Sequence, residues 1–128
     1  MQEKSKYEEM GSTLTTAIIY NGKALIGNAG DSRAYLISEN EITQISEDHI
    51  KKINTGMGGH FGTTSYLYNV IGGRDSDIVV DMFEVGLSPN DILLLCTDGL
   101  TGELSDSRIQ TIVSNADSVH DAGENLVT

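Results

Sequence analysis

The segment "NDILLLCTDGLTGELSD", residues 90–106, carries the strongest structural signal in the chain. Residues 92–96 are all apolar, and Thr97-Asp98-Gly99 ends the run abruptly. A short apolar run bounded by turn residues is typical of a strand with both faces covered. We therefore predict that residues 92–97 form an interior strand of a sheet. Asp98 then stands where the backbone leaves that sheet.

Two hairpins are predicted upstream of this strand. Residues 12–20 and 23–29 flank Asn21-Gly22, which is the strongest short-range hairpin signal. Residues 33–37 and 41–45 form the second pair. Successive side chains of a strand point to opposite faces, and apolar residues fall on both faces here, so both faces are expected to be partly buried, as in a sandwich. Residues 77–85 then resume strand chemistry before the strand at 92.

Helical signals follow the strands. Ile109, Ile112 and Val113 fall on one helical face after a cap at Ser105 or Ser107, and a second helix begins at Ser118 with Val119, Ala122 and Leu126. Residues 1–10 are polar and compatible with a helix. Strands followed by helices predict an α+β domain with an antiparallel sheet, and 128 residues fit a single domain, 1–128.

Residues 48–73 differ from the rest of the chain. They contain six glycines among scattered polar residues and show no sustained periodicity. We predict a loop-like excursion, because long loops in compact domains are commonly functional lids or disordered segments.

The composition limits the partners. The formal net charge is -11, so the chain repels nucleic acid and anionic membrane surfaces. A solvated acidic surface explains that charge most simply, and a cation site is the alternative. One cysteine, Cys96, forms no internal disulfide, and no apolar run approaches the roughly 20 residues of a membrane span. We expect a cytoplasmic protein.

Two aspartates end apolar strands. Asp98 follows residues 92–97, and Asp31 follows the apolar strand within "IGNAGDSRAYL", residues 26–36. Two such carboxylates suit one hard cation, whose preferred ligands are oxygens. For Asp98 the alternative is that it merely caps the turn that follows it.

Five segments in this order resemble motifs of the metal-dependent protein serine/threonine phosphatases, the PPM or type-2C family, and most closely its bacterial branch. They are "MGSTLTTAII" (10–19), "GNAGDSRAYLI" (27–37), "TQISEDH" (43–49), "NVIGG" (69–73) and "LLLCTDGLTGELSD" (93–106). Each is weak alone, but the ordered set is specific. The resemblance covers the chain from about Tyr7 onward.

The resemblance implies a β-sandwich flanked by helices and an active site at one end of it. There, two Mg²⁺ or Mn²⁺ ions activate the water that attacks a phosphoserine or phosphothreonine of a protein substrate. Asp98 matches a ligand of this metal cluster, and Asp31 matches a ligand of a third, looser metal. Residues 48–69 match the family's flap, which here is short and glycine-rich.

Several family motifs are absent from the 128 residues. The opening Asp-Gly-His-Gly-Gly segment with its bridging aspartate, an early phosphate-binding arginine and a terminal Asp-Asn motif have no counterpart. We therefore expect part of a phosphatase domain that alone is weak or inactive. Uncovered apolar interior is expected to favour a homodimer, strand swapping or association with another chain.

Other candidate residues receive structural interpretations. Arg33 is expected to pair with a carboxylate rather than with phosphate, and Asp48 to stabilise a turn rather than bind metal. The three histidines, His49, His60 and His120, lack metal-ligand spacing, so surface or hydrogen-bonding roles are expected. Cys96 lies in an apolar run and is expected to be a small core residue, not a nucleophile.

Three functional hypotheses remain from the sequence. The first is part of a Mn²⁺- or Mg²⁺-dependent protein phosphatase, and the second is a regulatory or binding module that kept the fold without catalysis. The third is an acidic β-rich domain that binds no metal, for which Mn²⁺ would leave the thermal stability unchanged.

Overall fold

A computed structural model describes residues 10–57, 60–67, 70–72 and 78–128. Of the helix-compatible residues 1–10, all but Met10 lie outside the described residues. The strands are β1 (Gly11–Ser12), β2 (Leu14–Tyr20), β3 (Lys23–Ala29), β4 (Arg33–Ile37), β5 (Ile42–Gln44), β6 (Ile50–Met57), β7 (His60–Leu67), β8 (Ile71–Gly72), β9 (Asp81–Gly86) and β10 (Ile92–Cys96). The helices are α2 (Asp98–Thr101), α3 (Asp106–Asn115) and α4 (Val119–Val127).

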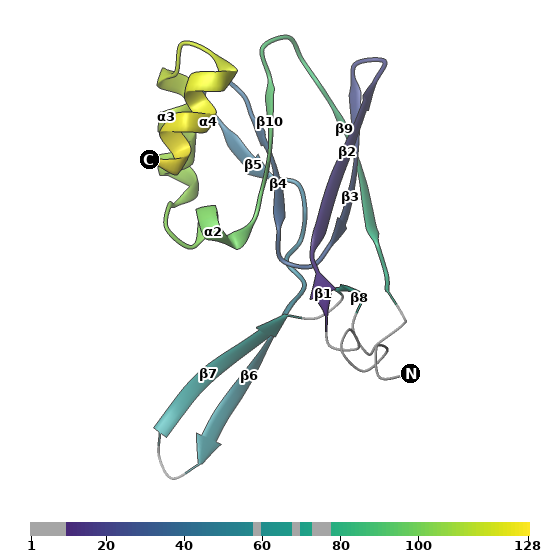
Figure 1. Ribbon diagram of the computed structural model, residues 1–128, viewed down its shortest axis with the longest axis vertical. Helices are drawn as coiled ribbons and strands as arrows, with labels where there is room; N and C mark the ends of the chain where they lie inside the picture. The colour runs from purple at the N-terminus through teal and green to yellow at the C-terminus, as the bar shows by residue number, and fades with distance from the viewer. Residues whose placement is uncertain (1–9, 58–59, 68–69, 73–77) are drawn as a thin grey trace.

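Two three-stranded antiparallel sheets face each other (Figure 1). One has the order β2-β3-β9 and the other the order β10-β4-β5. Buried Ala24, Ile26 and Ala34 lie between them, with Phe83 and Leu93 packed against this cluster. Side chains from the two inner faces pack together there and form the core between the sheets, as in a β-sandwich. The predicted α+β sandwich is confirmed.

The first hairpin forms as predicted between β2 and β3. Its register runs from Tyr20 opposite Lys23 to Leu14 opposite Ala29. Asn21 and Gly22 take positive φ angles of 49° and 72°, the conformation that a two-residue turn of this hand requires. The predicted strand begins later than expected, because Gly11–Ser12 pairs with β8 instead.

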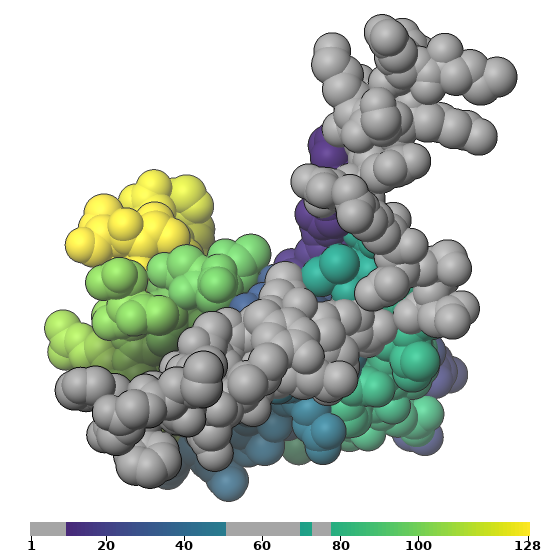
Figure 2. All heavy atoms as spheres, turned by 90° about the horizontal axis from the view of Figure 1, so that it is seen from below, coloured from purple at the N-terminus to yellow at the C-terminus, as the bar shows by residue number. Residues whose placement is uncertain are grey.

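Helices α3 and α4 cover the outer face of the β10-β4-β5 sheet (Figure 1). The side chains buried there are Tyr35, Ile37, Ile109, Val113, Ala122 and Leu126. Figure 2 shows the same arrangement from below, with the yellow-green helices on one flank and the teal residues of β9 on the other. No helix within the described ranges is long and apolar enough to cross a membrane.

Both helices begin at the predicted serines. The Ser105 hydroxyl accepts from the Arg108 N–H at 3.3 Å, and the Ser118 hydroxyl accepts from the Asp121 N–H at 3.0 Å. Of the two candidate caps for α3, Ser105 is therefore the one used. Each cap satisfies a backbone donor that the first helical turn leaves without a partner.

The interior position predicted for residues 92–97 is wrong. In the part of the chain that the structure describes, β10 pairs only with β4 and stands at the edge of its sheet, and Leu95 is 41% exposed. The apolar run has another cause. Ile92, Leu94 and Cys96 pack towards α3 and α4, while Leu93 packs towards the other sheet. The β10-β4-β5 sheet is the middle layer, so β10 has neighbours on both of its faces although it pairs along only one of its edges.

The loop predicted for residues 48–73 is also corrected. Strands β6 and β7 form an antiparallel hairpin in continuous register from Ile50 opposite Leu67 to Met57 opposite His60. It projects away from the two facing sheets (Figure 1). Ladder hydrogen bonds join backbone groups whatever the side chains are, so this segment forms strands without the alternation of apolar residues that marks a half-buried strand.

Candidate metal centre

The sheet register brings Asp31 and Asp98 to the same end of the molecule. Cys96 of β10 lies opposite Arg33 of β4. Asp31 stands two residues before Arg33, and Asp98 stands two residues after Cys96. Both therefore lie at the same end of the paired strands β4 and β10. The two carboxylates interact: burial and then the negative charge of Asp98 raise the pKa of the Asp31 carboxyl. The fold therefore brings the two aspartates to the same end of the sheet, near enough for the charge of Asp98 to act on Asp31.

Asp98 is not the residue that caps the turn. The Thr97 side chain does this, accepting from the Gly99 N–H at 3.3 Å. Asp98 is the first residue of the short helix α2, is exposed, and its carboxylate makes no hydrogen bond among the described residues. The capping role considered for Asp98 is therefore filled by Thr97, and the Asp98 carboxylate is available to a ligand.

Arg33 pairs with a carboxylate, as expected. Its Nε and terminal nitrogen donate to the two oxygens of Asp48 at 2.9 and 2.6 Å, which is a bidentate arrangement. This hydrogen bonding raises the pKa of Arg33. Gln44 Nε2 also donates to Asp48 at 3.0 Å. Asp48 is thereby committed to its protein partners and stabilises the loop, rather than presenting a free carboxylate.

Tyr35 extends this network to the helices. Its hydroxyl accepts from Arg33 at 2.7 Å and donates to Asp106, in the first turn of α3, at 2.8 Å. Burial raises the pKa of Tyr35 to about 12. Sequence reasoning missed this residue as part of the network. A tyrosine at a strand position that faces the core usually needs a partner for its hydroxyl, and that was the only available signal.

His49 is hydrogen-bonded, as predicted. It is 6% exposed, and its ring contacts the Gly30 N–H and the Asp81 carboxylate. His120 is exposed, 3.5 Å from Glu124. The His60 side chain lies outside the described side chains. Cys96 is partly buried, and burial raises the pKa of its thiol, which opposes a nucleophilic role.

Asn28 is a second residue that sequence reasoning missed. It is fully buried at the end of β3, and its Nδ2 donates to the carbonyls of Gly30 and Glu47 at 3.3 and 3.2 Å. Its Oδ1 accepts from Thr15 at 2.7 Å. Asn28 therefore fixes the backbone immediately before Asp31.

The donor chemistry of this end fits a hard divalent cation in part. Burial and the negative charge of Asp98 raise the pKa of Asp31, and a cation bound beside Asp31 would favour its ionised form. Arg33 does not neutralise them fully, because Asp48 holds its guanidinium. Within the described residues no group of three or more His, Cys, Asp or Glu side chains is placed to hold a metal. Among the described residues the site therefore offers two candidate ligands, Asp31 and Asp98.

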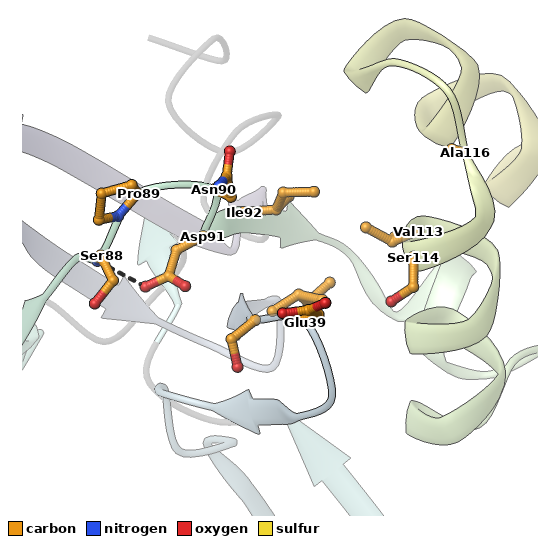
Figure 3. Close-up of a pocket in the computed structure, with 11 residues that line it drawn as sticks. Glu39, Ser88, Pro89, Asn90, Asp91, Ile92, Val113, Ser114 and Ala116 are labelled. Atoms are coloured by element: carbon orange, nitrogen blue, oxygen red, sulfur yellow. Dashed lines mark hydrogen bonds between the residues drawn. The ribbon is translucent and has the colours of Figure 1, made fainter.

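A hollow of about 670 Å³ lies at the opposite end of the same sheet (Figure 3). Ile37 and Ile92, which pair in the register, line it together with the turn at Ser88 and Asp91 and the last turn of α3. Neither Asp31 nor Asp98 lines it. This hollow is thus separate from the candidate metal centre.

Comparison with known proteins matches the chain to one family. Residues 1–52 match the family model "Protein phosphatase 2C". The serine/threonine phosphatase stp of Listeria welshimeri is 31% identical over 127 residues, which is 93% of this chain and 50% of the relative. Protein phosphatase PhpP of Streptococcus pneumoniae is 33% identical over 129 residues, which is 94% of this chain and 52% of the relative.

Solved structures give the same result. Serine/threonine phosphatase Stp1 from Staphylococcus aureus superposes with a TM-score of 0.77 at 28% identity, covering 98% of this chain and 52% of that one. At 21% identity, the catalytic domain of the phosphatase PstP in complex with two manganese ions shows the shared fold, with a TM-score of 0.73. The chain therefore belongs to the protein phosphatase 2C family and spans about half the length of the curated relatives that it matches.

Proposed function

We propose that the chain is part of a metal-dependent protein phosphatase that hydrolyses phosphoserine and phosphothreonine on proteins, and that it acts in the cytoplasm. The observation that carries the proposal is the placement of Asp31 and Asp98 at the same end of the sandwich, where the charge of Asp98 helps to raise the pKa of Asp31. The relatives' names support the reaction class.

Asp31 and Asp98 would hold Mn²⁺ or Mg²⁺, and such an ion supplies a bound water of lowered pKa and charge stabilisation for phosphoryl transfer. The chain's own residues contribute position. Asp48 holds Arg33 beside the pair, and Tyr35 ties Arg33 to α3, so the sheet end and the helix layer are fixed to each other. We further propose that residues 48–73, including the β6–β7 hairpin, act as the flap beside this centre.

The second candidate is a regulatory or binding module of the same fold. It is favoured by one observation, that the described residues place no third His, Cys, Asp or Glu side chain with Asp31 and Asp98 to complete a metal site. Such a module would bind a cation or a phosphoprotein without turning it over. The two candidates predict different results when a relative supplies the family motifs that this chain lacks. A phosphatase part then gives catalysis that depends on Asp98, whereas a binding module does not.

A chimera tests the proposed function. The matching half of the Listeria welshimeri relative is replaced by this chain, and Mn²⁺-dependent dephosphorylation of a phosphothreonine peptide is measured. We expect activity, and a loss of about 100-fold on Asp98→Asn, because an active site depends on preorganised charge. Asp117→Asn, an exposed carboxylate between α3 and α4, is the control and should change nothing. A folded chimera without activity, or one insensitive to Asp98→Asn, contradicts the proposal.

We also propose that a second copy of the chain covers the outer face of the β2-β3-β9 sheet. This outer face carries exposed apolar side chains from β2, from β9 and from the residue that precedes β9. They are Leu14, Ile18, Tyr20, Val80 and Met82, between 42% and 62% exposed. Lys23 and Glu84 pair across it at 3.1 Å, so their charges offset each other. An apolar patch of this kind favours association.

Sedimentation measurements test this association. We expect the chain to dimerise at micromolar concentration, and Ile18→Lys to give monomers because it places a charge in the outer face. Ile19→Lys is the matched control: Ile19 is similarly exposed but lies on the other side of the same strand. A wild-type chain that stays monomeric well above micromolar concentration contradicts the proposal.

A further inference from the structure

The backbone bends at Gly30, immediately before Asp31 of the candidate metal centre. Gly30 has a φ of 111°, which side chains of other residues rarely adopt, and a Cβ there would lie 2.5 Å from Thr13 Cγ2. Asp31 is the next residue. The direction of the Asp31 carboxylate therefore depends on how firmly this bend is held.

His49 holds the bend through both backbone groups of Gly30. Its ring Nδ1 accepts from the Gly30 N–H at 2.9 Å, and its backbone N–H donates to the Gly30 carbonyl at 3.1 Å. The side chain is 6% exposed, so water does not readily replace these bonds. The two residues are 19 positions apart, so this clamp joins the bend to the loop that precedes β6.

Asp81 fixes the form of the histidine. Because Nδ1 accepts a hydrogen bond, the neutral ring carries its proton on Nε2, and Nε2 donates to Asp81 Oδ2 at 2.7 Å. Asp81 opens β9, whose register places it opposite Asn28 at the end of β3. The Asp81 carboxylate thus orients the His49 ring, and the ring in turn accepts the hydrogen bond from Gly30, next to Asp31.

We propose that His49 and Asp81 are positioning residues for the candidate metal ligand Asp31, acting through the Gly30 backbone. This inference rests on the proposed function, because it assigns the clamp a role at that site. Ligands of a metal are commonly oriented by such outer partners, whose loss typically lowers metal affinity about 10–100-fold. Neither residue touches the cation in this proposal.

The test combines two readouts on the full chain. One is hydrogen exchange of the Gly30 amide in the metal-free protein, measured by NMR. The other is Mn²⁺ affinity, measured by calorimetry at a temperature where circular dichroism shows every variant folded. His49→Ala removes the side-chain bond of the clamp and keeps the backbone bond to the Gly30 carbonyl. His49→Asn keeps an acceptor near the Nδ1 position and loses the contact with Asp81. Ser46→Ala is the structural control, because it removes a buried 3.0 Å hydrogen bond to the Ala34 N–H without touching Gly30.

We expect His49→Ala to speed exchange of the Gly30 amide at least about tenfold and to weaken Mn²⁺ binding about 10–100-fold. His49→Asn should recover most of both, and Asp81→Ala should shift both in the direction of His49→Ala but less. Ser46→Ala should leave both at the wild-type value even though it destabilises the fold. The proposal is overturned if His49→Ala binds Mn²⁺ like wild type, or if Ser46→Ala weakens binding equally. Absence of Mn²⁺ binding by the wild-type chain instead refutes the proposed function, and the metal role of the clamp with it.

Discussion

The chain alone, saturated with Mn²⁺, is expected to hydrolyse p-nitrophenyl phosphate at least about 10³-fold more slowly than the lower end of the usual enzyme range, about 1 s⁻¹. Phosphate-monoester hydrolysis is among the slowest uncatalysed reactions, so its catalysis needs a complete set of oriented charges. Among the described residues the candidates for that set are Asp31 and Asp98, while Arg33 is held by Asp48.

Two missing contributions account for the size of this effect. The 128 residues contain no Asp-Gly-His-Gly-Gly segment to supply a carboxylate that bridges two ions. They also lack the early arginine of the bacterial members, and the Arg33 guanidinium is already paired. Losing one preorganised charge commonly costs about 10²–10³ in rate. Turnover near the enzyme range in a steady-state assay, abolished by Asp98→Asn, would show that the chain needs none of the missing motifs.

Elements determined by local chemistry were predictable from the sequence. The β2–β3 hairpin depends on Asn21 and Gly22, which adopt the positive φ angles of the turn. The starts of α3 and α4 depend on Ser105 and Ser118, whose hydroxyls accept from the first helical turn. Each of these signals involves residues three or fewer positions apart.

Elements determined by distant contacts were not predictable in the same way. The apolar run of β10 reflects packing on both of its faces, with Leu95 left exposed, but which strand edges are paired is set elsewhere in the chain. Tyr35 bonds Asp106, 71 positions away, and no local pattern joins them. Strands β6 and β7 carry too little alternation to reveal a hairpin that backbone bonds hold together.

The candidate centre was predictable only as a pair of positions. Two aspartates at strand ends suggested that both lie near one cation. The register, with Cys96 opposite Arg33, places them at the same end of the sheet. The supporting residues were not visible from the sequence. Asn28 is a buried amide within a strand, and His49 gains its role from contacts with Gly30 and Asp81.

Replacing Asp98 by Asn is expected to weaken Mn²⁺ binding at least about tenfold, or about 1.4 kcal/mol. The substitution keeps the size and shape of the side chain and removes its charge. Because the Asp98 carboxylate makes no hydrogen bond among the described residues, the folded structure loses little. The thermal stability of the metal-free chain should therefore stay close to that of wild type, which separates a lost ligand from a lost fold.

The most direct test of the Asp31–Asp98 site is a calorimetric titration of the chain with Mn²⁺, carried out on wild type, Asp98→Asn and Asp117→Asn. The last variant removes the same charge from an exposed position outside the candidate centre, so it controls for the net charge of -11. We predict saturable binding in wild type and Asp117→Asn and at least about tenfold weaker binding in Asp98→Asn. Equal affinity in all three proteins would contradict a cation site at Asp31 and Asp98.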